Sequence, residues 1–77
     1  MEPKKLVHMA NQIGEFFEAE PDQAAAFEGV AGHIHRFWDP RMRRALFQWV
    51  DAQGGQGLRP LVLKALEAHR QRLLPAA

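Results

Sequence analysis

The sequence predicts an all-α protein, a small bundle of four short helices, and two observations carry that prediction. Prolines recur at positions that suit the first turn of a helix, where the missing N–H costs little. The apolar residues between these prolines recur every three or four positions, which is the period of a helix packed on one face. The 77 residues are expected to form a single helical domain, residues 1–77, since a chain of this length leaves no room for a second.

The first expected helix covers about residues 4–18, after Pro3, and the second covers about residues 21–38, beginning at Pro21. In each segment the apolar residues form one stripe. In the first helix the stripe consists of Leu6, Met9, Ala10, Ile13, Phe16 and Phe17, and in the second of Phe27, Val30, Ala31, Ile34, Phe37 and Trp38. These stripes are expected to face the core of the bundle.

The third expected helix covers residues 40–53, between Asp39, a favourable N-cap, and the stop signal Gly54-Gly55. The fourth covers residues 60–73 and begins at Pro60. Their stripes consist of Met42, Ala45, Leu46, Trp49 and Val50, and of Leu61, Val62, Ala65, Leu66 and Leu73. Phe47 lies at the edge of its stripe, so its position leaves open whether it belongs to the core or to an interface.

The size and composition of the chain favour a protein that relies on a partner. A chain of this size buries only about 60% of the surface that its unfolded form exposes, so its own core is small. Cysteine is absent, which removes disulfides as a support. The net charge of +1 predicts neither nucleic-acid nor membrane binding, and no apolar run has the length of a membrane span or a signal peptide. We expect a soluble, cytoplasmic protein.

Two features of the second and third segments suggest a contact surface. Gly29 and Gly32 fall inside an expected helix, where each glycine costs about 1 kcal/mol relative to alanine. Three arginines follow Pro40, at the positive end of the helix dipole, where cations are disfavoured. An ordinary solvated face is the alternative to this hypothesis. The expected partner interface consists of Ala25, Gly29, Gly32, His33, Arg36, Arg41, Arg43 and Arg44.

Nothing in the sequence indicates an active site, and we expect no catalytic, cofactor-binding or metal-binding residue. Serine, threonine, tyrosine and cysteine are all absent, which removes the usual hydroxyl and thiol nucleophiles. The four histidines lack the spacing of a metal site. The glycine-rich run at 54–57 follows a helix and lacks the lysine of a P-loop, so it predicts a turn.

Two other classes of protein fit parts of this pattern. A helix-turn-helix protein would read DNA with the third segment, through Arg41, Arg43, Arg44 and Gln48, although the low net charge is against it. A self-assembling structural protein is the other alternative, and self-association of the isolated chain stays open.

Three runs of residues resemble the delta subunits of NAD-dependent, molybdenum-containing formate dehydrogenases. The first is Leu6-Val7-His8-Met9-Ala10-Asn11-Gln12-Ile13 with Phe16-Phe17, the second is residues 33–43, and the third is residues 57–62. Together they extend over most of residues 6–66, in the order of that family. Residues 24–26 and the tail after Leu66 match no motif of that family.

The resemblance implies a non-catalytic subunit in a hetero-oligomer with the large catalytic subunit of formate dehydrogenase. It places the bis-molybdopterin guanine dinucleotide and the iron–sulfur clusters in that partner, with no cofactor on this chain. The implied role is to stabilise the large subunit and to assist insertion of the molybdenum cofactor. A transient maturation chaperone of the same enzyme is the alternative.

Overall fold

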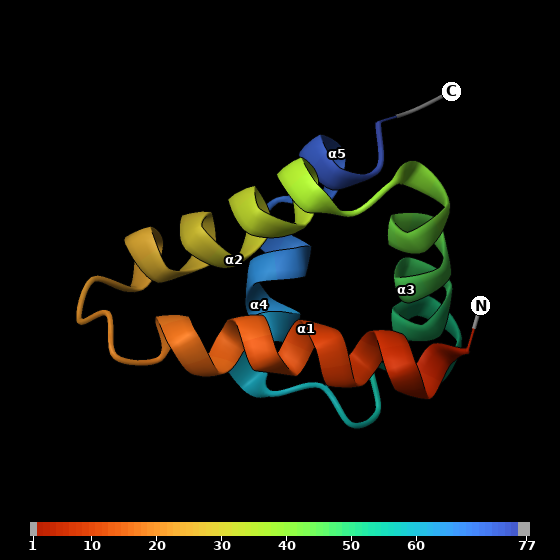
Figure 1. Cartoon of the computed structure of the whole chain (residues 1–77), viewed down its shortest axis with the longest axis horizontal. Coiled ribbons are helices and arrows are strands. Elements are labelled where there is room, and N and C mark those ends of the chain that lie inside the picture. Colours follow the sequence, from red (N-terminus) through yellow and green to blue (C-terminus); the bar gives the residue numbers. More distant parts are fainter. Residues whose placement is uncertain (1, 76–77) are drawn as a thin grey trace.

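The computed structural model describes residues 2–75, which form five helices joined by short loops (Figure 1). In Figure 1, α1 and α2 are two arms joined at one end by a loop, and α3 stands across their open end. Helix α4 packs against both arms, most extensively against α2, and the short α5 returns to α2. The predicted all-α bundle of four short helices is therefore confirmed, except that the fourth helix is divided into α4 and the short α5. The helices are α1 (Pro3–Phe17), α2 (Gln23–Phe37), α3 (Pro40–Gln53), α4 (Pro60–Ala68) and α5 (Arg70–Leu73).

Three of the four prolines expected to begin a helix do so, namely Pro3, Pro40 and Pro60. The prediction for Pro21 is wrong, because α2 begins two residues later, at Gln23. Asp22 decides the start: its Oδ1 accepts hydrogen bonds from the backbone N–H groups of the second and third helical residues, at 3.0 and 3.4 Å. An N-cap side chain satisfies donors that the helix itself leaves unpaired, and this sets the first turn.

The predicted fourth helix is interrupted. Gly54 ends α3 in the left-handed conformation (φ +66°), as predicted, but residues 60–73 form two helices that meet at His69 (φ −115°, ψ 25°). The break turns α5 back towards α2, where Leu73 becomes almost fully buried and Arg72 forms an ion pair with Glu28. Contacts distant in sequence thus decide the direction of the last turn.

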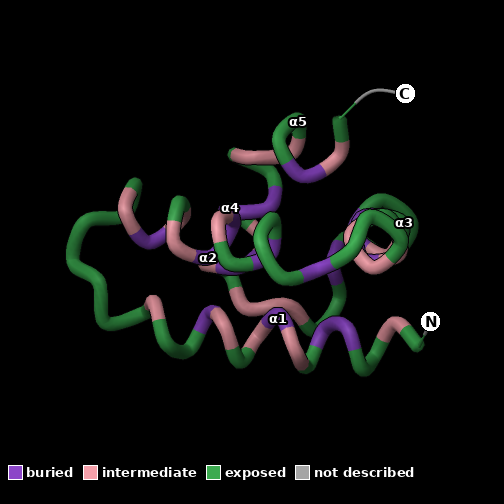
Figure 2. Tube along the Cα trace, turned by 45° about the horizontal axis from the view of Figure 1, so that its top comes forward, coloured by how far each residue is buried: buried purple, intermediate pink, exposed green. Residues whose placement is uncertain are grey.

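The core lies where the inward faces of the helices meet, and Figure 2 shows buried segments on each helix. Phe47 is 1% exposed, so it belongs to the core rather than to an interface. The buried cluster consists of Leu6, Val7, Ala10, Val30, Ala31, Ile34, Trp38, Leu46, Phe47, Val50, Val62, Ala65, Leu66 and Leu73.

Two phenylalanines predicted for the core stripes are instead exposed. Phe16 is 77% exposed and Phe37 is 64% exposed. Phe17, the neighbour of Phe16, turns its ring onto α2 at Gly29, which leaves Phe16 facing outward. Phe37 is the last residue of α2. The core position at this end of α2 is taken by Trp38, which follows it and is buried, so Phe37 faces outward.

The loop between α3 and α4 is held to α1 by one side chain. Asn11 donates from Nδ2 to the carbonyl of Gly57 (2.9 Å) and accepts at Oδ1 from the backbone N–H of Arg59 (3.0 Å). Arg59 is the N-cap residue of α4 and forms no side-chain cap of its own. Asn11 therefore fixes the start of α4 against α1. Among residues 2–75, none of the helices combines the length and the apolar character that a membrane crossing requires.

Candidate partner interface

The corner between α2 and α3 carries four of the eight residues expected at a partner interface. Asp39 caps α3 by accepting a hydrogen bond at Oδ1 from the backbone N–H of Met42 (3.0 Å), and the buried Trp38 anchors the corner to the core. The chain therefore turns sharply between the two helices. We call the four arginines around this turn the basic corner: Arg36, Arg41, Arg43 and Arg44.

The arginines outside the basic corner are all paired with carboxylates of this chain. Arg59 donates to Glu18 (3.0 Å) and Glu15 (3.1 Å), Arg70 pairs with Asp51, and Arg72 pairs with Glu28 (2.7 Å). In contrast, none of the four arginines of the basic corner forms an ion pair within residues 2–75. Their charges are left for solvent or for a partner, and guanidinium groups suit carboxylates and phosphates in particular.

The paired arginines are electrostatically satisfied. The hydrogen bonds that Arg59 donates to Glu18, and then the carboxylate charges of Glu18 and Glu15, raise the pKa of Arg59 above its ordinary range despite an opposing effect of desolvation. In the same way the hydrogen bond to Asp51 raises the pKa of Arg70. These pairs lie at the surface, where water screens the charges, and so contribute little to stability.

Arg43 differs from the other three arginines because it is half-buried. Its Nε and Nη1 atoms are inaccessible to solvent and have no hydrogen-bond acceptor among the described residues. A buried donor without an acceptor costs free energy. Other atoms of this chain already cover these two nitrogens, so the arginines of the basic corner that a partner can reach are the exposed Arg36, Arg41 and Arg44.

The small residues of the expected interface lie on α2, but a contact within the chain already explains one of the glycines. A Cβ at Gly29 would lie 2.3 Å from Cε1 of Phe17, so the close approach that this glycine permits is to α1. A Cβ at Gly32 would meet only the ends of the Glu28 and Arg72 side chains, at 3.1 and 3.7 Å.

The structure brings half of the expected interface residues together in one hollow. Gly29, Gly32, His33 and Arg36 line a surface depression of about 280 Å³ together with Phe17, Glu28 and Phe37. The arginines of α3 do not line this depression, and neither does Ala25, which is half-buried about one turn before Gly29. The role of all eight residues in binding stays a prediction.

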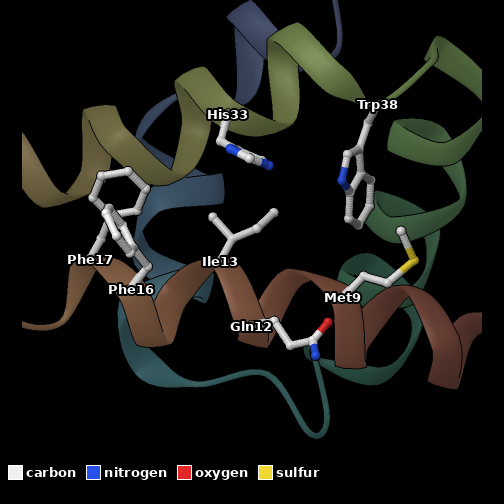
Figure 3. A pocket seen from close by; sticks show the side chains of 7 residues that line it. All are labelled: Met9, Gln12, Ile13, Phe16, Phe17, His33 and Trp38. Atoms are coloured by element: carbon white, nitrogen blue, oxygen red, sulfur yellow. The ribbon is translucent and has the colours of Figure 1, made fainter.

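An apolar groove beside this depression was not anticipated from the sequence. It lies between α1 and α2 and has a volume of about 520 Å³ (Figure 3). In Figure 3 the rings of Phe16 and Phe17 stand at one end, Trp38 stands at the other, and Ile13 lies between them. The only sequence signal was the excess of apolar residues around the first stripe, which could not be divided into core and surface. The lining residues are Met9, Gln12, Ile13, Phe16, Phe17, His33 and Trp38.

The described part of the chain offers no obvious metal-binding chemistry. No group of three or more His, Cys, Asp or Glu residues in it is arranged to hold a metal ion. The histidine nearest to both hollows, His33, packs its ring on Phe37, with centroids 4.7 Å apart. The expectation that this chain holds neither a cofactor nor an active site stays a prediction.

Fold and surface together define a small all-α protein with a basic corner beside an exposed apolar groove. Residues 5–66 match the family model of the NADH-dependent formate dehydrogenase delta subunit, FdsD, and the chain belongs to this family. The resemblance seen in the sequence is thereby confirmed. No curated protein and no solved structure matches the chain. Membership makes the chain an accessory subunit of formate dehydrogenase and implies a hetero-oligomeric complex.

Proposed function

We propose that this chain binds the large catalytic subunit of a cytoplasmic, NAD-dependent, molybdenum-containing formate dehydrogenase and stabilises it without performing chemistry itself. Family membership supports the identity of the enzyme, and the basic corner supports the way in which the chain binds it. The observation that carries the proposal is the division among the arginines. Arg59, Arg70 and Arg72 are paired within the chain, and the four arginines of the basic corner are not.

Binding stabilises the large subunit through mass action. A subunit that binds only the folded form of its partner raises the free energy of unfolding of that partner as its concentration exceeds the dissociation constant. Carboxylates of the large subunit pair with the exposed guanidinium groups of Arg36, Arg41 and Arg44.

Assistance in cofactor insertion is the second part of the proposal. The bis-molybdopterin guanine dinucleotide and the iron–sulfur clusters belong to the large subunit, and the delta subunit holds that subunit in a conformation that accepts the molybdenum cofactor. A permanent subunit remains bound at a fixed ratio after loading. A transient maturation chaperone, the alternative, is released once the cofactor is in place, so the ratio before and after loading separates the two roles.

The test reverses two charges of the basic corner. The double variant R36E/R41E should lose most of its co-purification with the large subunit, because like charges replace complementary ones at the contact. The matched control is K4E/K64E, which makes the same change in net charge at two exposed lysines outside the basic corner. We expect the control to co-purify normally.

Folding must be checked in the same samples. The glutamate that R41E introduces lies in the first turn of α3, where its interaction with the helix dipole is favourable. The glutamate that R36E introduces lies in the last turn of α2, where the same interaction destabilises the helix by about 0.3–1 kcal/mol. Helicity by circular dichroism should therefore be unchanged. Normal co-purification of R36E/R41E would reject the basic corner as the contact. Recovery of nucleic acid instead of the large subunit with the wild-type chain would reject the proposed function.

A further inference from the structure

Three hollows that share lining residues lie along α1 where it meets α2 and α3. The groove of Figure 3 shares Met9 with a hollow of about 440 Å³ that Met42 of α3 also lines. At its other end it shares Phe17 and His33 with the depression on α2. We call these three neighbouring hollows together the α1–α2 track.

The track gathers the exposed apolar side chains of the molecule. Phe16 lines the groove and Phe37 lines the depression, and these are the two large hydrophobic residues that stay mostly exposed among residues 2–75. Met9 and Met42 line the other end. Aromatic residues and methionine are enriched at the centres of protein interfaces, where flexible thioethers adapt to a partner.

The charges along the track are basic. Lys5 and Arg36 line it and form no ion pair in the described part of the chain. One of its two carboxylates, Glu28, is neutralised by an ion pair within the chain. Glu28 is held by two hydrogen bonds from Arg72, and Glu2 accepts from the backbone N–H of Lys4 at the start of α1. An occupant with carboxylates beside its apolar residues therefore complements the track.

The shape of the groove suits a helix. Its α1 wall runs from Met9 to Phe16, two helical turns of about 10 Å. The edge-to-face pair Phe16–Phe17, with centroids 4.9 Å apart, closes one end, and Trp38 closes the other. An apolar channel between two helices is the geometry in which an amphipathic helix lays its i, i+3, i+4 and i+7 side chains.

We propose that the α1–α2 track binds an acidic amphipathic helix of the large formate dehydrogenase subunit. Its apolar face packs on Ile13, Phe16 and Phe37, and its carboxylates lie near Lys5 and Arg36. A second copy of this chain is disfavoured, because a symmetric contact would bring the same cations together. The inference rests on the proposed function and specifies the partner segment.

Photocrosslinking in the intact complex tests the identity of the occupant. A photoreactive phenylalanine analogue replaces Phe16 or Phe37, and position 64, exposed on α4, serves as the control site. We expect both track positions to crosslink to one helical segment of the large subunit that carries Asp or Glu beside its apolar residues. Crosslinks to a second copy of this chain, to a basic or non-helical segment, or only at the yield of the control site would overturn the proposal.

Affinity measurements separate this inference from the proposed function. The variant F16A/F37A removes two exposed rings and should bind the large subunit at least ~10-fold more weakly, as truncation of interface anchors does. The control K64A should bind as the wild type does. If the wild-type chain itself fails to bind the large subunit, the proposed function fails. If the wild type binds and F16A/F37A binds equally tightly, the track is not the docking site and the proposed function stands.

Discussion

The ring of Phe17 occupies the space that a side chain at residue 29 would fill. A Cβ built on Gly29 would lie 2.3 Å from Cε1, 2.5 Å from Cδ1 and 2.7 Å from Cζ of this ring. Helices α1 and α2 therefore meet at this point through an aromatic ring on one helix and bare backbone on the other. The glycine sets how closely the two helices approach, and thereby the closed end of the groove.

Gly29→Ala should destabilise the protein by roughly 1 kcal/mol. Alanine gains about 1 kcal/mol of helix propensity, but overpacking of this kind typically costs about 1–3 kcal/mol. In the background of Phe17→Ala the overlap is gone, so the same change should stabilise. Chemical denaturation of the four proteins of this double-mutant cycle measures the coupling.

Gly32→Ala is the matched control on the same helix. A Cβ there would meet only the ends of the exposed Glu28 and Arg72 side chains, at 3.1 Å or more, so it should stabilise the protein by several tenths of a kcal/mol. If Gly29→Ala were as favourable as Gly32→Ala, Phe17 would not be fixed against α2.

Asn11→Ala should lower the free energy of unfolding by about 1–3 kcal/mol. The change removes the acceptor of the partly buried N–H of Arg59, and an unpaired donor in such a position costs about that much. Asn11→Asp keeps the acceptor but turns a carboxylate oxygen to the carbonyl of Gly57. Because this contact is exposed and water can separate the two oxygens, its loss should be smaller. Thermal unfolding followed by circular dichroism ranks the three proteins, and equal losses in both variants would contradict the role given to Arg59.

Much of the fold follows from local signals in the sequence. The helix starts at Pro3, Pro40 and Pro60 and the stop at Gly54 depend on a proline ring or a left-handed turn, which act within a few residues. The prediction was wrong at Pro21 because a proline and an aspartate compete there, and the hydrogen bonds of Asp22 decide.

The features missed depend on contacts that are distant in sequence. Periodicity cannot tell which of two adjacent rings faces the core, and the glycine that receives Phe17 lies on another helix. The break at His69 likewise serves contacts of α5 with α2. The basic corner was visible as a cluster of arginines, but their lack of acidic partners became clear only when the pairs of the other arginines were seen.

Truncation of Phe47 should lower the stability of the protein strongly, whereas truncation of Phe16 should hardly change it. Phe47 is 1% exposed, and Arg70 stacks on its ring with Cζ 5.0 Å from the centroid. Phe47→Ala should cost about 3–5 kcal/mol, most of the stability of a small domain. Phe16→Ala should change stability by no more than about 0.5 kcal/mol. Urea denaturation measures both, and a large loss in Phe16→Ala would show that this ring belongs to the core.

Acid should weaken the contact between α2 and α5 through Glu28. Hydrogen bonds from Arg72 hold the pKa of Glu28 below its ordinary value, with the charges of Arg72 and His69 adding to the effect and burial opposing it. A carboxyl whose pKa is lowered by folding stabilises the protein fully above its unfolded pKa, about 4.3, and loses that contribution as the pH falls through its folded pKa. Glu28→Gln should therefore lower the melting temperature near about pH 6 and leave it close to the wild-type value near about pH 3. In the background of Arg72→Gln, the difference in melting temperature that Glu28→Gln causes near about pH 6 should be smaller. A difference in melting temperature between the wild type and Glu28→Gln that stays constant with pH would show that Glu28 acts through packing rather than through charge.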